Sequence, residues 1–413
     1  MQKVKVEVEI KHAFQCAALN QFAFDSLYYD FLGHELKVFN GVPRPSKWLN
    51  KGRSFVKCVA VLSKLILHLW HCFAYIYFFA KAISFFSLSK KRKEKELDLD
   101  MVALGVCNRS YDVINQAIGH DENITFLTLL DPQQLNSKGR SVSVSSFLNF
   151  RDVLHVFLMS CKIHLHLKKC EGGRLAFQSY AVVDWLAMYY ALRKINPKHI
   201  ITAEHHDRWA ILADFYSGQR SIGSENLSFT VVQHGLEFEG TYKRMRSLGF
   251  SEGLPYKIKN LSKIYCYNSE QFSIFVKNIF FHYPQPQSVA CIYYQFGLIL
   301  SDVVGTRRSV LFVGSPICEG FHIKLYSMLD ARMSVECYYK PHPTSTVDKA
   351  ISKLGWNVID DKDFFPRVNL VVSYPSTLVN EYRSAGVFVV EHPFECGDDE
   401  LYTFYESIKG ALV

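Results

Sequence analysis

The order of short apolar runs, polar turns and helical segments constrains the fold of this chain more than any other feature. Residues 98–105 (LDMVALGV) form an apolar, β-rich run, and a segment with helical spacing follows it. The run 199–204 (HIITAE) enters a polar loop before a helical pattern resumes at Trp209, and 227–235 (LSFTVVQHG) also ends in a polar turn. Strands that alternate with helices in this way predict a parallel sheet flanked by helices.

The alternation is interrupted once and then restarts, which predicts two domains. Prolines, a glycine and paired arginines loosen the pattern between 280 and 308, so we place a linker at 286–308. A second series of strands and helices begins with SVLFVGSP at 309. The predicted fold class is α/β, with two doubly wound, Rossmann-like parallel-sheet domains (1–285 and 309–413) facing each other across a cleft. A length of 413 residues fits two domains better than one.

Residues 55–88 are overwhelmingly apolar and are followed at once by a basic run at 90–95. The stretch without Lys or Arg, 65–80, is shorter than the ~20 residues that a spanning helix needs. Three interpretations remain open: a buried helix pair, an interfacial amphipathic helix, and a short membrane anchor. The basic run favours peripheral contact with an anionic bilayer, and a solvated charged turn between two core helices is the alternative.

Composition narrows the class of protein. Hydrophobic residues make up 49% of the chain and charged residues 21%, as in globular proteins and unlike disordered ones. The net charge of +8 indicates an anionic partner, and no helix-turn-helix or ribonucleoprotein-type element points to nucleic acid. The 11 cysteines include no CxxC pair, so we expect reduced thiols, a cytoplasmic protein and no metal site. The opening MQKVKVEVEIKH lacks the apolar core of a secretory signal.

Ligands of doubly wound sheets bind at the carboxyl ends of the parallel strands. The polar segments that follow the predicted strands are therefore the places to look for chemistry. In chain order they are HHDRW (205–209), QHG (233–235), YNSE (267–270), VGSP (313–316), KPHP (340–343) and SYPST (373–377).

The KPHP segment holds Lys340 and His342 stiffly at a strand end, since each proline fixes its own φ and biases the residue before it. An ammonium and an imidazole can both donate hydrogen bonds to phosphate oxygens. The plainer interpretation is a rigid surface turn in which the histidine is incidental.

In SYPSTLVNE, Ser376 and Thr377 stand where the helix after a strand begins, a position suited to an anion. An ordinary helix cap is the alternative. Glu381, about one turn further on, is placed to accept hydrogen bonds from a ribose, although an exposed helical glutamate is equally typical. Gly314 and Ser315 of VGSP form a tight turn that lets the backbone approach a ligand closely.

In the first domain, His234 of the QHG segment and the acidic loop residues Glu204 and Asp207 are candidate bases for an acceptor hydroxyl. Two adjacent histidines beside acids, His205 and His206, also fit a hydrated loop. A metal site is the third interpretation, and no HExxH helix supports it.

Taken together, QHG, KPHP and the stretch S-x-P-S-T-L-x-x-E resemble bacterial surface-polysaccharide transferases with the GT-B fold. That group includes polysialyltransferases, capsule Kdo transferases, lipooligosaccharide sialyltransferases and the teichoic-acid CDP-glycerol polymerases, and the resemblance covers roughly 200–390. It implies that Lys340, His342, Ser376 and Thr377 bind the donor phosphate. It also implies that Glu381 lies near the ribose. His234 is implied to lie near the acceptor or to act as the base.

The sequence departs from the teichoic-acid pattern, because Gly-Leu-Glu follows His234 where Gly-Thr-Pro is usual, and no aspartate precedes the serines. The resemblance therefore implies a metal-independent, inverting glycosyltransferase that takes a CMP-activated, sialic acid- or Kdo-like sugar to a cell-surface polysaccharide or lipooligosaccharide. No separate cofactor is implied, and the chain is expected in the cytoplasm at the inner face of the membrane. The alternatives are a UDP-sugar, GDP-sugar or CDP-glycerol donor on the same scaffold, and a non-catalytic polysaccharide-assembly protein.

Overall fold

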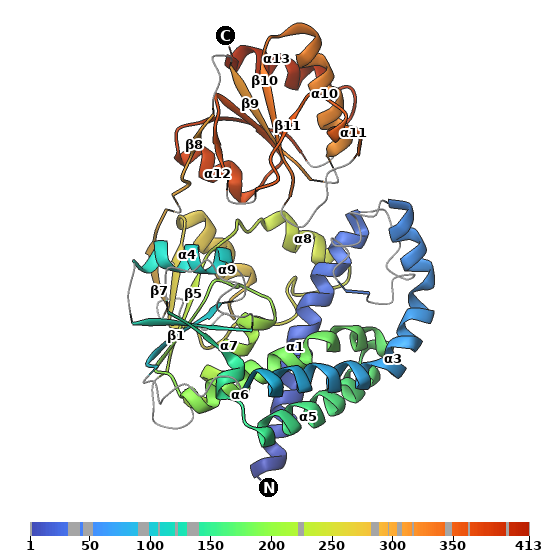
Figure 1. The fold of residues 1–413 in the computed structure, drawn as a ribbon, viewed down its shortest axis with the longest axis vertical. Helices are drawn as coiled ribbons and strands as arrows, with labels where there is room; N and C mark the ends of the chain where they lie inside the picture. The colour runs from blue at the N-terminus through green and yellow to red at the C-terminus, as the bar shows by residue number, and fades with distance from the viewer. Residues whose placement is uncertain are drawn as a thin grey trace. The chain divides into compact units, whose positions relative to one another are not determined.

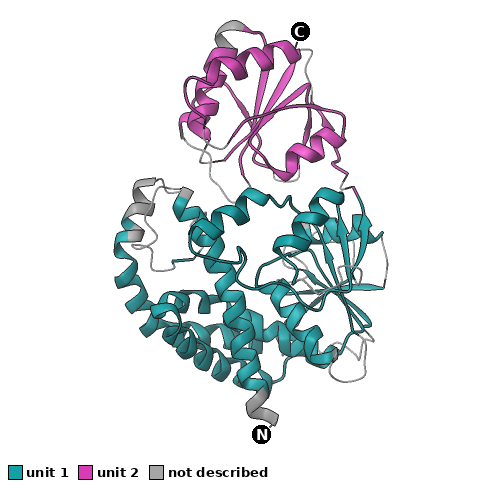
Figure 2. Cartoon of the chain, turned by 180° about the vertical axis from the view of Figure 1, so that it is seen from behind, with its two compact units in different colours: residues 1–43, 57–294 teal, residues 44–56, 295–413 magenta. Residues whose placement is uncertain are grey.

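The computed structural model describes most of the chain (Figure 1). The described residues are 2–31, 42–43, 53–89, 99–105, 108–119, 123–129, 140–221, 227–281, 289–295, 297–303, 308–315, 318–342, 349–361, 364–393 and 396–412. The basic run at 90–95 and Pro316 of the VGSP turn lie outside them. The chain divides into unit 1, residues 1–43 and 57–294, and unit 2, residues 44–56 and 295–413 (Figure 2).

Unit 1 is built on a seven-stranded sheet in the order β3-β2-β1-β4-β5-β6-β7, in which every pairing is parallel. Its strands are β1 (Met101–Gly105), β2 (Ile124–Thr128), β3 (Arg140–Ser143), β4 (His199–Thr202), β5 (Ser228–Val232), β6 (Lys263–Cys266) and β7 (Ala290–Tyr293). The order reverses between β1 and β4, which is the arrangement of a doubly wound sheet.

The helices of this part of the chain supply most of the core. They are α1 (Gln2–Phe31), α3 (Arg53–Ser89), α4 (Asn108–Ile118), α5 (Phe150–Lys169), α6 (Val182–Ile195), α7 (Arg208–Ser221), α8 (Glu239–Ser247) and α9 (Ser269–Asn278), with 3-10 turns η2 (Val144–Phe147) and η3 (Glu171–Ala181). Helix α6 is buried over Val182–Leu192 except for Asp184. Asn149 begins α5 in a capping box with Asp152, and Asn196 ends α6 in the left-handed conformation, at φ 55°.

Unit 2 holds a five-stranded parallel sheet in the order β11-β10-β9-β13-β14, and a separate parallel pair, β8 with β12. The strands are β8 (Ser301–Asp302), β9 (Ser309–Val313), β10 (Glu336–Lys340), β11 (Asn357–Val358), β12 (Pro366–Arg367), β13 (Leu370–Ser373) and β14 (Phe388–Glu391). The helices are α10 (Glu319–Arg332), α11 (Lys349–Ser352), α12 (Thr377–Ser384) and α13 (Leu401–Leu412).

Two apolar clusters cover the two faces of the unit 2 sheet. On β9, Val310 and Phe312 belong to the cluster that includes residues of α10 and α13. Leu311 and Val313 belong to the other cluster, which includes residues of α12. Alternate residues of one strand therefore bury against opposite layers, as expected of a parallel sheet covered on both faces. The predicted α/β fold class, with two doubly wound parallel sheets in one chain, is confirmed.

The segment predicted as a linker, 286–308, contains β7 of the first sheet and β8 of unit 2, and the boundary between the units falls after Tyr294. Proline and glycine in that segment loosen the helical pattern without preventing short strands at either end. The prediction that the two domains face each other across a cleft stays a prediction.

The apolar segment 55–88 forms a single continuous helix, α3, and not a helix pair. One face of α3 is fixed to the unit 1 core by polar contacts: Trp70 Nε1 donates to the carbonyl of Ala176 at 2.9 Å, and Lys81 forms an ion pair with Asp184 at 2.7 Å. By length and composition, the part Val61–Leu88 is long and apolar enough to cross a membrane.

Candidate functional site

Three polar loops lie side by side at the carboxyl edge of the unit 1 sheet. Strands β4, β5 and β6 are neighbours in the sheet, so the residues that follow them (203–207, 233–238 and 267–268) leave the same edge. The sequence predicted polar loops at the carboxyl ends of parallel strands, and the strand order makes these three loops neighbours. The structure decides which side chains in them touch.

Glu237 and two histidines form the centre of this group. His205 Nδ1 lies 3.1 Å from Glu237 Oε1, and His206 Nδ1 lies at an ion-pair distance of 3.4 Å from the same oxygen. Tyr242 donates its hydroxyl proton to Glu237 Oε2 at 2.6 Å. Glu237 and His205 are buried, at 7% and 3% exposed, so this carboxylate is stabilised by its partners and not by water.

A backbone hydrogen bond fixes the tautomer of His205. The amide of His234 donates to His205 Nε2 at 2.9 Å. An amide N–H can only donate, so Nε2 carries the lone pair and Nδ1 carries the proton that goes to Glu237. Two hydrogen bonds in series, from His205 to Glu237 and from the His234 amide to His205, therefore hold the QHG loop in position.

The side chain of His234 bridges to the neighbouring loop. Its Nδ1 makes a short hydrogen bond to the carbonyl oxygen of Ala203, the residue after β4. Because a carbonyl only accepts, Nδ1 carries the proton of the neutral ring, and the basic lone pair is on Nε2. The ring is half-buried, with its centroid 4.6 Å from that of His205.

The charges of the group follow from burial and hydrogen bonding. Burial lowers the pKa of His205 to about 4, so that ring is neutral. Burial opposes the charge on His206, but Glu237 outweighs it and raises the pKa of His206. Burial alone would raise the pKa of Glu237, yet the hydrogen bond from His205 and the nearby His206 ring hold it well below its usual range. The group therefore contains an anionic Glu237 and a neutral His205, and beside them His206 stacks on Phe24 with ring centroids 4.0 Å apart.

The two acids predicted from the sequence have other surroundings. Asp207 Oδ1 accepts from the backbone amides of Trp209 at 2.7 Å and Ala210 at 3.2 Å, so Asp207 caps the first turn of α7. Burial, and then the charge of Glu204, raise the pKa of Asp207 to about 7. Burial also raises the pKa of Glu204, whose amide donates to Thr202 Oγ1 at 3.0 Å.

Two buried glutamines hold the QHG loop through hydrogen bonds to its backbone. Gln233 Nε2 donates to the carbonyl of Gly235 at 2.8 Å and to Gln271 Oε1 at 2.6 Å. Gln271 Oε1 also accepts from the amide of Glu237 at 2.9 Å, and its Nε2 donates to the Glu237 carbonyl at 3.0 Å. The amide of Gln271 in turn donates to the side chain of Asn268, the N-cap residue of α9. This network sets the direction in which Glu237 points.

Helix α1 contributes to the same edge, although the sequence analysis assigned it no role. Asn20 Nδ2 donates to the carbonyls of His206 at 2.9 Å and Tyr256 at 3.0 Å, and its Oδ1 accepts from the Tyr256 amide. Together with the stacking of Phe24 on His206, this fixes the 205–207 loop. No spacing within the first 31 residues indicates such a long-range contact.

In unit 2 the ends of four strands lie in one row. Val313 of β9 is in register with Lys340 of β10 on one side and Ser373 of β13 on the other, and Ser373 is in register with Glu391 of β14. The candidates Gly314, Ser315, Lys340, His342, Ser376 and Thr377 therefore all lie at or just beyond this edge. Strand order reverses around β9, so the loops after β9 and β13 flank the switch point of the sheet.

Gly314 is required by a close approach of the backbone to a buried ring. A Cβ at this position would lie 2.2 Å from the hydroxyl oxygen of Tyr339, a side chain that is 0% exposed. The amide of Gly314 donates to the carbonyl of Lys340 at 2.8 Å, which ties the loop to β10. Glycine here serves the packing of the loop that carries Ser315.

Lys340 is 5% exposed and directs its ammonium into the protein. Nζ donates to the carbonyls of Asp361 at 3.0 Å and Phe364 at 2.8 Å, and lies 4.4 Å from the centroid of the Phe365 ring. Two of its three N–H groups thus hold the segment after β11. Its predicted phosphate contact stays a prediction, and its partners here give it a structural role.

The remaining unit 2 candidates are His342 and three residues of the segment that leads into α12. His342 is half-buried, and burial lowers its pKa, so the ring is neutral. Ser376 is the N-cap residue of α12, yet its side chain makes no capping bond to the helix; Oγ lies 3.3 Å from Ser373 Oγ. The ordinary-cap interpretation therefore does not describe Ser376. Thr377 is half-buried, whereas Glu381 is 4% exposed and lies inside α12.

The structure brings together two further groups that the sequence did not assign. His205 and Glu237 hold the His234 segment, and the part of Glu204 and Asp207 as bases stays a prediction. A glutamate three residues after His234 was the available signal. The second group, Cys318 with two histidines in unit 2, is described below.

Comparison with known proteins leaves the family open. No family model and no curated protein matches the chain. Among solved structures, a UDP-GlcNAc 2-epimerase from Neisseria meningitidis bound to UDP-GlcNAc matches at 11% identity, over 75% of this chain and 90% of that one, with a TM-score of 0.42. The UDP-GlcNAc 2-epimerase of Methanocaldococcus jannaschii matches at 9% identity (76% and 92% covered, TM-score 0.38). MurG of Acinetobacter baumannii also matches at 9% (75% and 82%, 0.34). Similarities this distant assign neither a family nor an activity.

Proposed function

We propose that this chain is a glycosyltransferase that moves a sugar from a nucleotide-activated donor to a hydroxyl of a cell-surface glycan. The donor is proposed to be CMP-activated, with a sialic acid- or Kdo-like sugar. One observation carries the proposal: His234 stands at the carboxyl edge of the first sheet with its Nδ1 proton bound to a carbonyl and its basic nitrogen on the other side of the ring.

In the proposed reaction His234 is the general base. The bond between the anomeric carbon and the donor phosphate oxygen breaks, and the acceptor oxygen bonds to that carbon. The acceptor proton passes to His234 Nε2, and the nucleotide leaves as its phosphate anion. An imidazole held by a carbonyl at Nδ1 keeps its orientation while Nε2 gains the proton.

His205 and Glu237 act as positioning residues in this scheme. They hold the backbone of His234 through the bond to its amide, while Tyr242 holds Glu237 from the other side. Asp207 is proposed to serve mainly as the cap of α7.

The donor side of the proposal rests on the switch point of unit 2. The Gly314–Ser315 turn after β9 and the Ser376–Thr377 segment after β13 offer hydroxyl and backbone groups to a phosphate. Such donors lower the barrier because they stabilise the charge that develops on the leaving phosphate. The net charge of +8 supports an anionic donor.

The replacement His234→Asn tests the base. An asparagine amide can still donate to the Ala203 carbonyl, so the loop is kept while the basic nitrogen is lost. We expect turnover at saturating donor to fall about 10²–10⁴-fold with donor affinity unchanged. His206→Asn is the matched control, a neighbouring histidine outside the proposed proton transfer, and is expected to keep most of the turnover. Equal activity of His234→Asn and wild type would refute the base.

The donor is tested by calorimetric titration of the full chain with CMP, CDP, UDP and GDP. Tightest binding of CMP, weakened by Ser376→Ala and Thr377→Ala, is the expected result. Tighter binding of UDP or GDP would refute the CMP-activated donor and favour a UDP-sugar or GDP-sugar instead. No binding of any of the four, together with no glycan turnover, would favour the non-catalytic assembly protein.

We further propose that the chain acts at the inner face of the cell membrane. The outward face of α3 exposes large apolar side chains: Val61, Leu62, Leu65, Leu69, Phe73, Ile76, Phe79, Ile83 and Leu88. Helix α5 adds Phe150, Leu154, Leu158 and Leu165, and ring contacts of Phe79 with Phe157 and Phe86 with Phe150 join the two helices. A continuous apolar face of this kind is typical of a membrane or protein contact, and the basic sequence at 90–95 favours an anionic bilayer.

A further inference from the structure

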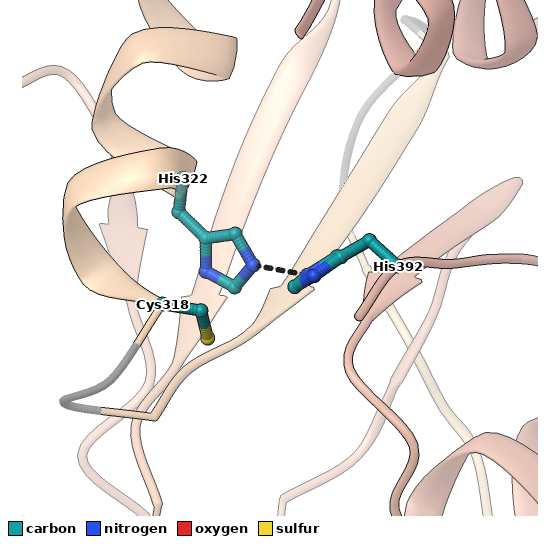
Figure 3. A group of neighbouring side chains, drawn as sticks. All are labelled: Cys318, His322 and His392. Carbon is teal, nitrogen blue, oxygen red and sulfur yellow. Dashed lines mark hydrogen bonds between the residues drawn. The ribbon is translucent and has the colours of Figure 1, made fainter. Parts of the chain in front are cut away.

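A cluster of metal-ligating side chains lies at the carboxyl edge of unit 2, outside the residues used above. Cys318 directly precedes α10, His322 lies one turn further along that helix, and His392 directly follows β14. Their ligand atoms lie within 4.8 Å of one another, and the residues are 2%, 0% and 1% exposed. Figure 3 shows the three side chains converging from the helix and the strand end.

Hydrogen bonds define the tautomers of the two rings. His392 Nδ1 donates to the carbonyl of Pro393 at 2.7 Å, so its Nε2 carries the lone pair. That nitrogen faces His322 Nε2 at 2.8 Å, and one proton between them makes His322 the donor. His322 Nδ1 then carries a lone pair, is fully buried, and has no hydrogen-bond partner.

We propose that Cys318, His322 and His392 bind a zinc-like transition-metal ion. One thiolate and two imidazoles form a mixed sulfur and nitrogen set that suits Zn²⁺. Tetrahedral zinc places two nitrogen ligands about 3.3 Å apart, so the two Nε2 atoms, now 2.8 Å apart, separate by about half an ångström. The ring proton of His322 moves from Nε2 to Nδ1 as the ion takes the Nε2 lone pair. The Pro393 carbonyl supplies the outer hydrogen bond that metal-bound histidines usually make.

The proton balance of binding is simple. Burial raises the pKa of Cys318 to about 12 and lowers the pKa of both rings, so all three groups are neutral before an ion enters. On binding, the Cys318 thiol loses its proton to solvent, and each imidazole keeps one N–H. The three described ligands leave a fourth position open for water or another group.

The other histidine group of the molecule is less suited to an ion. His205 Nε2 accepts from a backbone amide, so the nitrogen that faces Glu237 already holds the ring proton. A metal at that nitrogen would move the proton to Nε2, where it would oppose the amide N–H of His234. In the unit 2 cluster the ring proton of His322 also has to move, but it goes to Nδ1, which faces no backbone amide.

The ion would join two layers of unit 2 beneath the VGSP loop. The carbonyl of Ser315 accepts from the amides of Cys318 at 3.0 Å and Glu319 at 3.1 Å, so this loop and the start of α10 move together. The amide of His392 donates to the carbonyl of Ser373 at 2.9 Å, which connects the ion to the end of β13. The proposed role is therefore structural, and it does not depend on the proposed transferase activity.

The test uses the full chain, freed of metal with a chelator and titrated with Co²⁺ and then with Zn²⁺. We expect one equivalent of Co²⁺ to give tetrahedral visible bands with a thiolate charge-transfer band, and Zn²⁺ to displace it. Cys318→Ser should abolish the charge-transfer band, and His392→Gln should weaken zinc affinity by more than the ~10–100-fold cost of losing an outer-shell partner.

Cys396→Ser is the matched control. Its sulfur lies 3.9 Å from His392 Nδ1, on the side of the ring away from His322, so the band should persist. Circular dichroism of each variant shows whether it has folded, and the His392→Gln measurement stands if Cys318→Ser does not fold. The proposal is overturned if the wild-type chain binds less than one equivalent, or if Cys318→Ser and Cys396→Ser bind cobalt alike.

Discussion

Replacement of Gly314 by alanine isolates the close packing beneath the proposed donor loop. The added Cβ would lie 2.2 Å from the Tyr339 hydroxyl oxygen, 2.4 Å from Cζ and 2.7 Å from Cε1. Contacts between carbon atoms are normally about 3.5–4.0 Å, so the ring has to retreat by more than an ångström. Its way is blocked by Trp356, whose ring centroid is 5.1 Å from that of Tyr339.

Overpacking of a close-packed core by a methyl group costs about 1–3 kcal/mol. Tyr339 is fully buried and cannot move into solvent, so we expect Gly314→Ala to lower the free energy of unfolding of unit 2 by about 3 kcal/mol, the upper end of that range. Displacement of the ring would also lengthen the 3.4 Å contact between the Tyr339 hydroxyl and Glu319. Gly314 is not among the residues with positive φ, so backbone strain adds nothing to this effect.

Amide hydrogen exchange of β9 and β10, read by mass spectrometry on the full chain, gives the opening free energy of unit 2 itself. Gly320→Ala on α10 is the control, since its added Cβ meets nothing within 4 Å and an alanine in a helix gains about 0.5–1 kcal/mol. A Gly314→Ala protein as stable as wild type to within about 0.5 kcal/mol would refute the steric reasoning.

Two further predictions concern unit 1. Burial raises the folded pKa of Asp207 to about 7, well above the ordinary value of an aspartate, so this group stabilises the fold fully at low pH and loses that contribution as pH rises towards 7. Asp207→Asn keeps a capping oxygen for α7 and should flatten the fall of the unfolding free energy between pH 4 and 7, measured by urea denaturation; an unchanged slope would contradict the assignment. Replacing Leu69, Phe73 and Phe79 on α3 with serine should weaken co-sedimentation with phosphatidylserine vesicles more than about 100-fold, since each side chain contributes about 1.5–3 kcal/mol when buried. Equal sedimentation of variant and wild type would remove the membrane proposal.

Much of the fold could be predicted because each strand has a recognisable local sequence pattern. Buried parallel strands such as β9 are continuous apolar runs, and the polar turns after them mark their ends. Parallel strands share one carboxyl edge, so the sequence also predicted that the polar segments after the strands lie at such edges; which segments are neighbours came from the strand order. Helix α3 was harder to interpret, because the apolar composition of 55–88 fits a helix pair as well as one long helix.

Local sequence patterns could not predict which side chains contact one another at each sheet edge. Glu204 and Asp207 stand next to the histidines in sequence, but the turn into α7 directs Asp207 to the helix amides and leaves Glu237 to meet His205. Lys340 follows a strand like a ligand-binding residue, yet its ammonium turns inward to two carbonyls. Each outcome depends on where a loop from another strand happens to run.

The sequence by itself determined the two parallel sheets, the edge at which each carries its polar loops, and the loops that hold the candidate residues. These follow from local periodicity and from the common direction of parallel strands. Only the tertiary structure decided which side chains meet: Glu237 with His205, and His322 with His392 from 70 residues away. Such contacts join separate strands through the sheet order, and no spacing along the chain encodes that order.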